Sequence, residues 1–225
     1  MGALTTAGPR IHRHPRRGTS WVRFLGLHMR ARLVPYGVVA VALVAAVSWA
    51  AAGYLMDRPF SSGPDARIPV VVAAPLVCSI LLSMGLGGRD ELLERSTAVP
   101  WRAVRAGHVV VMATVPGVAL ALTGMRASQT YGAFELVRNT AGFAGVVLLA
   151  AVALGAGLAW LPVGIYAGVV YLAAPRDLPE HTVWWTWPLQ PWGTTGAAWV
   201  AAALFVAGLI LYCRLGARAG HDHDH

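Results

Sequence analysis

The chain has 225 residues, of which 56% are hydrophobic and only 12% are charged. A soluble domain carries about 25% charged residues, and several apolar runs here approach the roughly 20 residues that a helix needs to cross a bilayer. The composition therefore argues against a soluble enzyme and predicts an all-α integral membrane protein. The net charge of +8 does not indicate nucleic-acid binding, because the arginines cluster beside the apolar runs.

Two segments are expected before the first span. Residues 1–18 are basic and rich in proline and glycine, which predicts a disordered tail. A signal peptide is the alternative, but the apolar stretch from Val34 to Met56 is too long for one. Over residues 19–33, apolar side chains recur from Trp21 to His28 at i, i+3, i+4, i+7 spacing, with most arginines elsewhere on the wheel. This pattern predicts an amphipathic helix in the membrane interface; a simple extension of the first span is the alternative.

A six-span transmembrane domain is predicted for residues 34–214. The longest apolar run, 140–174, exceeds one crossing, and we divide it near residues 158–162, where Pro162 removes a helix donor. The tail that follows the domain, residues 215–225, ends in alternating histidine and aspartate. The expected spans cover approximately 35–56, 68–86, 107–125, the two halves of 140–174, and 196–213.

The arginines also predict the orientation of the chain. All 18 basic residues are arginine, and with a cytoplasmic N-terminus most of them fall on the cytoplasmic side. The positive-inside rule therefore places both termini in the cytoplasm. Only five arginines fall outside: Arg58, Arg67, Arg126, Arg138 and Arg176.

The predicted spans contain no acidic residue and no arginine, since all ten acidic residues and every arginine are assigned to loops or tails. Ion-coupled transport needs ionisable groups at membrane depth, so we do not expect this chain to be an ion-coupled transporter. Carbonyls of a broken helix could still bind sodium. No histidine pair suits a membrane haem, and no phosphate-binding loop of the Walker type occurs. We expect no catalytic residue and no cofactor on this chain.

The loop between the second and third spans, residues 89–105, is charged. Asp90 can cap a short helix, whose face then carries further charged side chains. Pro100 suits the first turn of the helix that leads into the third span. A solvated loop with orienting arginines is the alternative. The residues expected to contact a partner are Asp90, Glu91, Glu94, Arg95, Arg102 and Arg105.

The external segment between the fifth and sixth spans, 176–195, is rich in tryptophan. Because tryptophan prefers the headgroup region, we expect this segment to lie in the outer interface or dip into it. An aromatic sugar-binding platform is the alternative. Four of the nine tryptophans occur here, at Trp184, Trp185, Trp187 and Trp192.

The C-terminal tail contains His221, His223 and His225, which alternate with aspartates. Such a set suits a divalent transition metal. A terminal tail has no outer shell of residues to orient its ligands, so a disordered tail or a cloning remnant is the alternative. We assign no metal site to the chain and keep these histidines as a weak candidate.

In layout, the chain resembles the membrane subunit of ATP-binding-cassette exporters of the type-2 permease superfamily, in particular the short actinobacterial kind. The resemblance is carried by 19–33, by 176–195, and by the string Asp90–Thr97 followed by Arg102, Arg105 and His108. In that family an amphipathic helix precedes six spans. The loop between the second and third spans forms a coupling helix, and a re-entrant or interfacial segment lies outside.

This resemblance implies a non-catalytic permease subunit in a bacterial cytoplasmic membrane. ATP and Mg²⁺ would then bind to a separate ATPase docked on loop 89–105, and a second permease, identical or different, would complete the transporter. A spanning region without charge favours an apolar or amphipathic cargo. Two alternatives remain open: a membrane anchor or assembly partner that uses the tryptophan-rich segment, and a metal-handling protein that uses the His/Asp tail.

Overall fold

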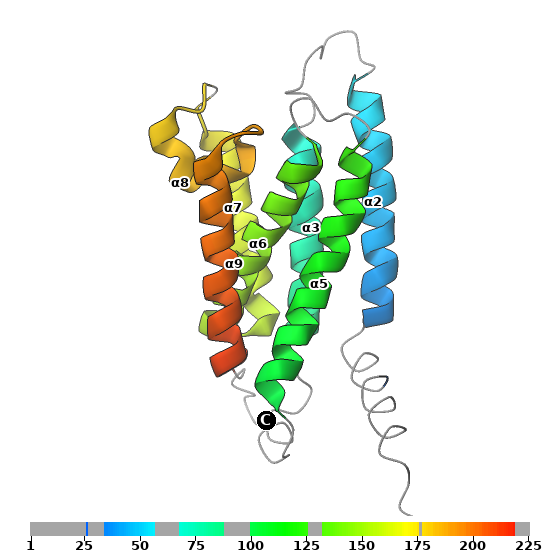
Figure 1. The fold of residues 1–225 in the computed structure, drawn as a ribbon, viewed down its shortest axis with the longest axis vertical. Coiled ribbons are helices and arrows are strands. Elements are labelled where there is room, and N and C mark those ends of the chain that lie inside the picture. The colour runs from blue at the N-terminus through cyan, green and yellow to red at the C-terminus, as the bar shows by residue number, and fades with distance from the viewer. Residues whose placement is uncertain are drawn as a thin grey trace, which may run out of the picture.

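A computed structural model of the chain describes residues 34–56, 68–87, 100–125, 132–175 and 177–218, together with Gly26 (Figure 1). The basic tail 1–18, nearly all of the expected interfacial helix 19–33, and the C-terminal histidines lie outside these residues. Of the charged loop 89–105, only the part from Pro100 onward is described.

The six long helices of the described residues run alternately up and down, side by side, in a single bundle (Figure 1). Two irregular connections contain short helical turns: η2 (Ala156–Leu158), and the succession of η3 (Glu180–Thr182), α8 (Val183–Thr186) and η4 (Trp187–Leu189). The described part of the chain has no β-strand. The long helices are α2 (Val34–Met56), α3 (Ile68–Leu86), α5 (Trp101–Gly124), α6 (Ala133–Leu154), α7 (Trp160–Ala173) and α9 (Thr195–Leu215).

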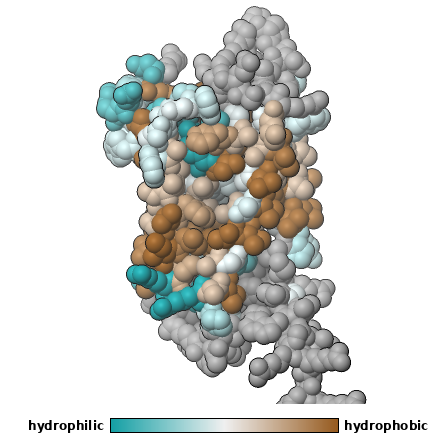
Figure 2. Space-filling view, viewed as in Figure 1, coloured by the Kyte–Doolittle hydropathy of each residue, from teal (hydrophilic) through white to brown (hydrophobic). Residues whose placement is uncertain are grey.

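Five stretches are long and apolar enough to cross a membrane: α3, α5, α6, the η2–α7 stretch Ala156–Ala173, and α9. Hydrophobic residues cover the middle of the visible face, and hydrophilic ones gather near its ends (Figure 2). The part of the chain that the structure describes is thus helical, with the composition of a multi-pass membrane protein. The described apolar stretch of α2, Pro35–Ala51, is shorter, so a sixth span at this helix stays a prediction.

The break in the long apolar run falls earlier than Pro162. Helix α6 ends at Leu154 because Gly155 has φ 92°, a left-handed conformation that side chains disfavour. Pro162 lies inside the first turn of α7, where the missing N–H has no intrahelical acceptor to lose. Glycine, and not proline, therefore separates these two helices.

The expectation that no acidic residue and no arginine lies in a spanning helix is wrong. Helices α5 and α9 include Arg102, Arg105 and Arg214 near their ends, and α6 includes two buried charged residues. Helix α6 begins at Ala133, well before the first residue of the apolar run, and so includes Glu135 and Arg138. Both side chains are buried, with exposures of 1% and 4%. Hydropathy placed them in a loop because it counts charge and does not register the partners that a folded chain supplies.

Helix α6 is the centre of the bundle and contacts α3, α5, α7 and α9, together with the short turns η2 and η4. Phe143, Val147 and Leu148 are fully buried along it. Its closest neighbour is α9, because Gly145 and Gly208 let the two backbones approach: a Cβ at Gly145 would lie 2.4 Å from the carbonyl carbon of Leu204. Small residues are the usual means of close helix packing in membranes, where no hydrophobic force acts between helices.

Candidate functional site

The two ends of the bundle differ in chemistry. One end, which we call the tryptophan end, contains the start of α6 and the segment from η3 to η4, with Trp184, Trp187 and Trp192 (Figure 1). The opposite end, the arginine end, contains the start of α5 and the end of α9. Its four described arginines are Arg102, Arg105, Arg214 and Arg218.

At the tryptophan end, the segment between α7 and α9 folds back into the bundle. The ring of Trp187 is 1% exposed and lies between Phe143, at 5.1 Å, and Tyr166, at 6.2 Å. The Tyr166 hydroxyl donates to the Trp185 carbonyl at 2.7 Å. By contrast, Trp184 and Trp192 are 71% and 69% exposed. One of the four predicted tryptophans therefore anchors the segment, and two point outward, where an interface would receive them.

A slot at Gly142 receives the Trp187 ring. A Cβ at Gly142 would lie 2.3 Å from the ring atom Cη2. We expect Gly142→Ala to displace the ring and to destabilise the fold by about 1–3 kcal/mol. In a Trp187→Phe background the same change should cost clearly less, because the smaller ring leaves room for the methyl group.

Thermal unfolding of the two single variants and the double variant gives this coupling. Gly168→Ala is the matched control, since a Cβ there meets nothing within 4 Å. Equal effects of Gly142→Ala in both backgrounds would show that Trp187 does not occupy the slot.

Beneath this segment, Asn139 joins three elements. Its Nδ2 donates to the carbonyl oxygens of Val71 in α3, at 3.0 Å, and of Pro188 in η4, at 2.8 Å. The Val71 carbonyl needs this donor because Pro75, four residues later, has no N–H to complete the helical hydrogen bond. The amide of Asn139 in α6 thus satisfies the carbonyl that Pro75 leaves without a donor in α3.

Arg138 continues this junction. Its Nη2 donates to the Gln190 carbonyl at 2.8 Å, and its Nε donates to Oδ1 of Asn139 at 3.1 Å. The Gln190 side chain in turn donates to Thr186 Oγ1 at 2.9 Å, and Thr186 donates to the Thr182 carbonyl. Arg138 and Asn139 thus fasten the backbone of the segment at Gln190 and Pro188.

Glu135 closes the start of α6. Its Oε2 accepts the backbone N–H of Gly132 at 2.8 Å, which satisfies one of the free donors of a helix N-terminus. A carboxylate in this first turn also interacts favourably with the helix dipole. The buried charges of α6 therefore hold parts of the backbone in place. The described residues contain no group of three His, Cys, Asp or Glu side chains able to hold a metal.

Sequence reasoning identified the tryptophans but missed Arg138 and Asn139. One signal was present: polar residues directly precede the apolar run, and Pro75 interrupts another span. A proline inside a spanning helix leaves a carbonyl that some donor must satisfy. Which donor this is depends on packing between α3 and α6, which the sequence does not display.

At the arginine end, only Arg102 and Arg105 of the six expected partner contacts are described; Asp90, Glu91, Glu94 and Arg95 lie outside. Arg102 is exposed on the first turn of α5. The guanidinium of Arg105 lies against the end of α9, where a Cβ at Gly216 would be 2.9 Å from Nη1. A cation there is favourable because the carbonyl end of a helix carries partial negative charge.

The chain beyond α9 also closes this end. The backbone N–H of Arg218 donates to the Ala151 carbonyl at 3.0 Å, and its guanidinium donates to Ala153 at 3.2 Å. The Tyr212 hydroxyl donates to the Leu86 carbonyl at 2.7 Å. The bonds to Ala153 and Leu86 satisfy last-turn carbonyls of α6 and α3, where a helix leaves its carbonyls without an intrahelical donor. The Ala151 carbonyl also accepts the N–H of Gly155, at 3.0 Å.

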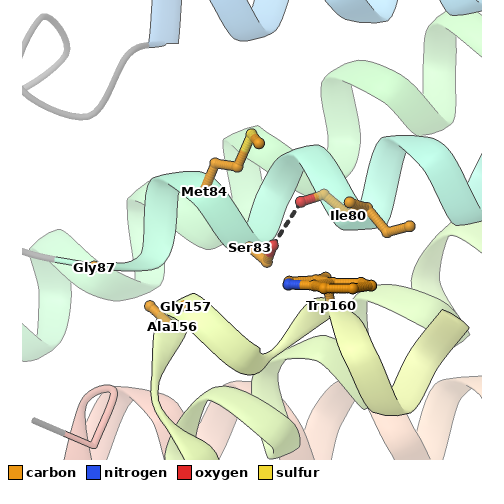
Figure 3. Close-up of a pocket in the computed structure, with 7 residues that line it drawn as sticks. All are labelled: Ile80, Ser83, Met84, Gly87, Ala156, Gly157 and Trp160. Carbon is orange, nitrogen blue, oxygen red and sulfur yellow. Dashed lines mark hydrogen bonds between the residues drawn. The ribbon is translucent and has the colours of Figure 1, made fainter. Parts of the chain in front are cut away.

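A cavity of about 440 Å³ lies at the arginine end between the last turns of α3 and the η2–α7 connection (Figure 3). Its walls are mostly apolar. The lining residues are Ile80, Ser83, Met84, Gly87, Ala156, Gly157 and Trp160.

No family model, curated protein or solved structure matches the chain.

Proposed function

We propose that the chain is the permease subunit of an ATP-binding-cassette exporter, driven by a separate ATPase that docks at the arginine end. The observation that carries the proposal is the pairing of two features on one helical bundle. A charged loop joins α3 to α5 at one end, and a tryptophan-anchored segment folds back between α7 and α9 at the other. The membrane subunits of the exporters that this chain resembles have the same layout.

The buried charges of α6 do not turn the proposal toward ion-coupled transport. Arg138 and Asn139 donate to backbone carbonyls, and Glu135 accepts a backbone N–H. Groups that relay a proton or hold an ion line a pathway, whereas Arg138 and Asn139 fasten one segment to the bundle and Glu135 caps the start of α6. An apolar or amphipathic cargo remains the favoured class, with the apolar cavity at the arginine end as the supporting feature.

A membrane anchor or assembly partner is the second candidate function. The exposed rings of Trp184 and Trp192 favour it, since they present aromatic surface beyond the spans. A metal-handling role would rest on His221, His223 and His225, which lie outside the described residues, and no observation favours it.

The test is co-purification of the tagged full chain from its native host in mild detergent. We expect a stoichiometric ATPase to be recovered with the chain and to be lost from Glu91→Lys/Glu94→Lys, because charge reversal on the docking loop replaces attraction by repulsion. The amounts of both chains are measured by quantitative mass spectrometry.

The matched control reverses two carboxylates at the tryptophan end, Asp177→Lys/Glu180→Lys, both of which are exposed. This variant changes the net charge equally and should retain the ATPase. Absence of an ATPase in several detergents would reject the permease function, and equal loss from both double variants would reject the docking site.

A further inference from the structure

The cavity at the arginine end has the size of a ligand site. Its volume of about 440 Å³ falls in the range of roughly 300–1,000 Å³ that is usual for small-molecule pockets. Two of its lining residues are glycines, Gly87 and Gly157, and the wall between them is Ala156. Small side chains thus make the space, while Trp160 and Ile80 close its other end (Figure 3).

The lining chemistry favours an apolar occupant. Ser83, the one hydroxyl in the lining, already donates to the Ile80 carbonyl at 2.6 Å. Within the part of the chain that the structure describes, the indole N–H of Trp160 makes no hydrogen bond. A bound water needs two to four polar partners, which these walls do not supply. The cavity therefore suits an apolar chain that carries one hydrogen-bond acceptor, placed to accept from the Trp160 N–H.

The cavity opens sideways, toward the surface of the bundle that a bilayer would cover. Met84, Gly157 and Trp160 all line it and are exposed. Helix α3 and the η2–α7 stretch, which form its two walls, are both apolar enough to span a membrane. An acyl chain could therefore enter from the bilayer without crossing water, and would fill space that otherwise lacks packing contacts.

The charge around the arginine end favours anionic molecules among those that carry an acyl chain. Four arginines lie at the arginine end, and the described acidic residues, Glu135, Asp177 and Glu180, all belong to the tryptophan end. Arg218 lies next to the cavity wall. Its carbonyl oxygen would be 2.9 Å from a Cβ at Gly155, and Gly155 directly precedes the lining residue Ala156. Arginines beside a spanning region attract anionic headgroups.

We propose that this cavity binds one acyl chain of an anionic phospholipid, with the headgroup held among the arginines of the arginine end. The Trp160 N–H then donates to an oxygen of the lipid near the glycerol. The inference does not rest on the permease function, since a resident lipid would serve a transporter and an anchor alike.

The test is lipid titration of the purified full chain in detergent, with bound lipid counted by native mass spectrometry. The probes are dioleoyl phosphatidylglycerol and dioleoyl phosphatidylcholine, which share their acyl chains and differ in charge. We expect the anionic lipid to bind about fivefold more tightly or better. Gly157→Phe should weaken it by about tenfold, because the new ring occupies the cavity.

Gly168→Phe is the matched control, because Gly168 lies on the same apolar stretch, outside the cavity, and a Cβ there meets nothing within 4 Å. Arg218→Gln, which removes the charge beside the cavity wall, should lower the preference for the anionic lipid without weakening the zwitterionic one. Trp160→Phe, which keeps the wall and removes the donor, should weaken both lipids and remains informative if Gly157→Phe does not fold. Equal binding by Gly157→Phe and Gly168→Phe would overturn the cavity as the site, and equal affinity for both lipids would overturn the anionic ligand.

Discussion

Replacing Asn139 by leucine should cause one of the largest losses of stability that a single polar substitution can produce in this chain. The change removes the donor from the carbonyls of Val71 and Pro188 and the acceptor from Arg138 Nε. A typical interhelical hydrogen bond in a membrane contributes only about 0.6 kcal/mol. A buried group left without a partner costs about 1–3 kcal/mol. Because Pro75 offers Val71 no helical donor, the second figure applies to that carbonyl.

The measurement is thermal unfolding followed with a thiol-reactive dye, for which the buried thiol of Cys78 is a natural reporter. We expect the midpoint of Asn139→Leu to fall by about 5 °C or more. Thr140→Val is the matched control: it is the next residue, equally buried, and its hydroxyl donates only to the Leu136 carbonyl within the helix. A midpoint for Asn139→Leu within error of this control would contradict the three-element junction.

Replacing Gly145 by leucine should separate α6 from α9. A Cβ at this position would lie 2.4–2.5 Å from the backbone carbon, oxygen and nitrogen atoms of Leu204 and Phe205. Backbone cannot swing aside as a side chain can, so α9 must shift as a unit. Gly208 faces the same contact, with a Cβ 2.6 Å from the Gly145 carbonyl oxygen. We expect a loss of about 3 kcal/mol or more, or no monodisperse protein after extraction.

Gly164→Leu is the matched control, for which we expect no loss of stability in the same assays. A Cβ at Gly164 in α7 meets nothing within 4 Å, and leucine is a better helix former than glycine by roughly 0.8 kcal/mol. The control should therefore unfold at the same temperature as the parent chain or slightly higher. Similar losses from both leucines would mean that α6 and α9 do not meet at Gly145.

Both variants act on α6, and together they separate its two roles. Asn139 lies in the part of α6 that holds the tryptophan-anchored segment, and Gly145 lies two turns further along, at the contact with α9. A variant that loosens the segment alone should leave the arginine end intact, because Tyr212 and Arg218 fasten that end independently. Lipid binding at the cavity should consequently survive Asn139→Leu in protein that remains folded.

Much of the helical layout was predictable from local composition. Long apolar runs without charge have few other ways to satisfy their backbone groups in a bilayer, and the bounds expected for α3, 68–86, agree with those observed. Helix ends next to polar residues were less predictable. The start of α6 was placed too late, since Glu135 and Arg138 read as loop residues until their partners are known.

The candidate site divides in the same way. Tryptophan content pointed to the segment between α7 and α9, because the residue type itself carries an interfacial preference. Which ring turns inward was not predictable, since the four tryptophans share one composition and one neighbourhood. Trp187 is the buried one because Gly142 leaves a slot for it, and Gly142 is 45 positions away along the chain.

The sequence by itself determined that this protein is helical, multi-pass and charged mainly outside its apolar runs, because each of those properties follows from residues close together in the chain. Tertiary structure alone decided that two ionisable residues enter α6, that an amide in one helix satisfies the carbonyl freed by a proline in another, and that a cavity remains beside the arginine end. These features arise between segments 49–68 residues apart and elsewhere at similar separations. Their physical cause is complementarity of donors, acceptors and volume, which exists only once the helices are packed.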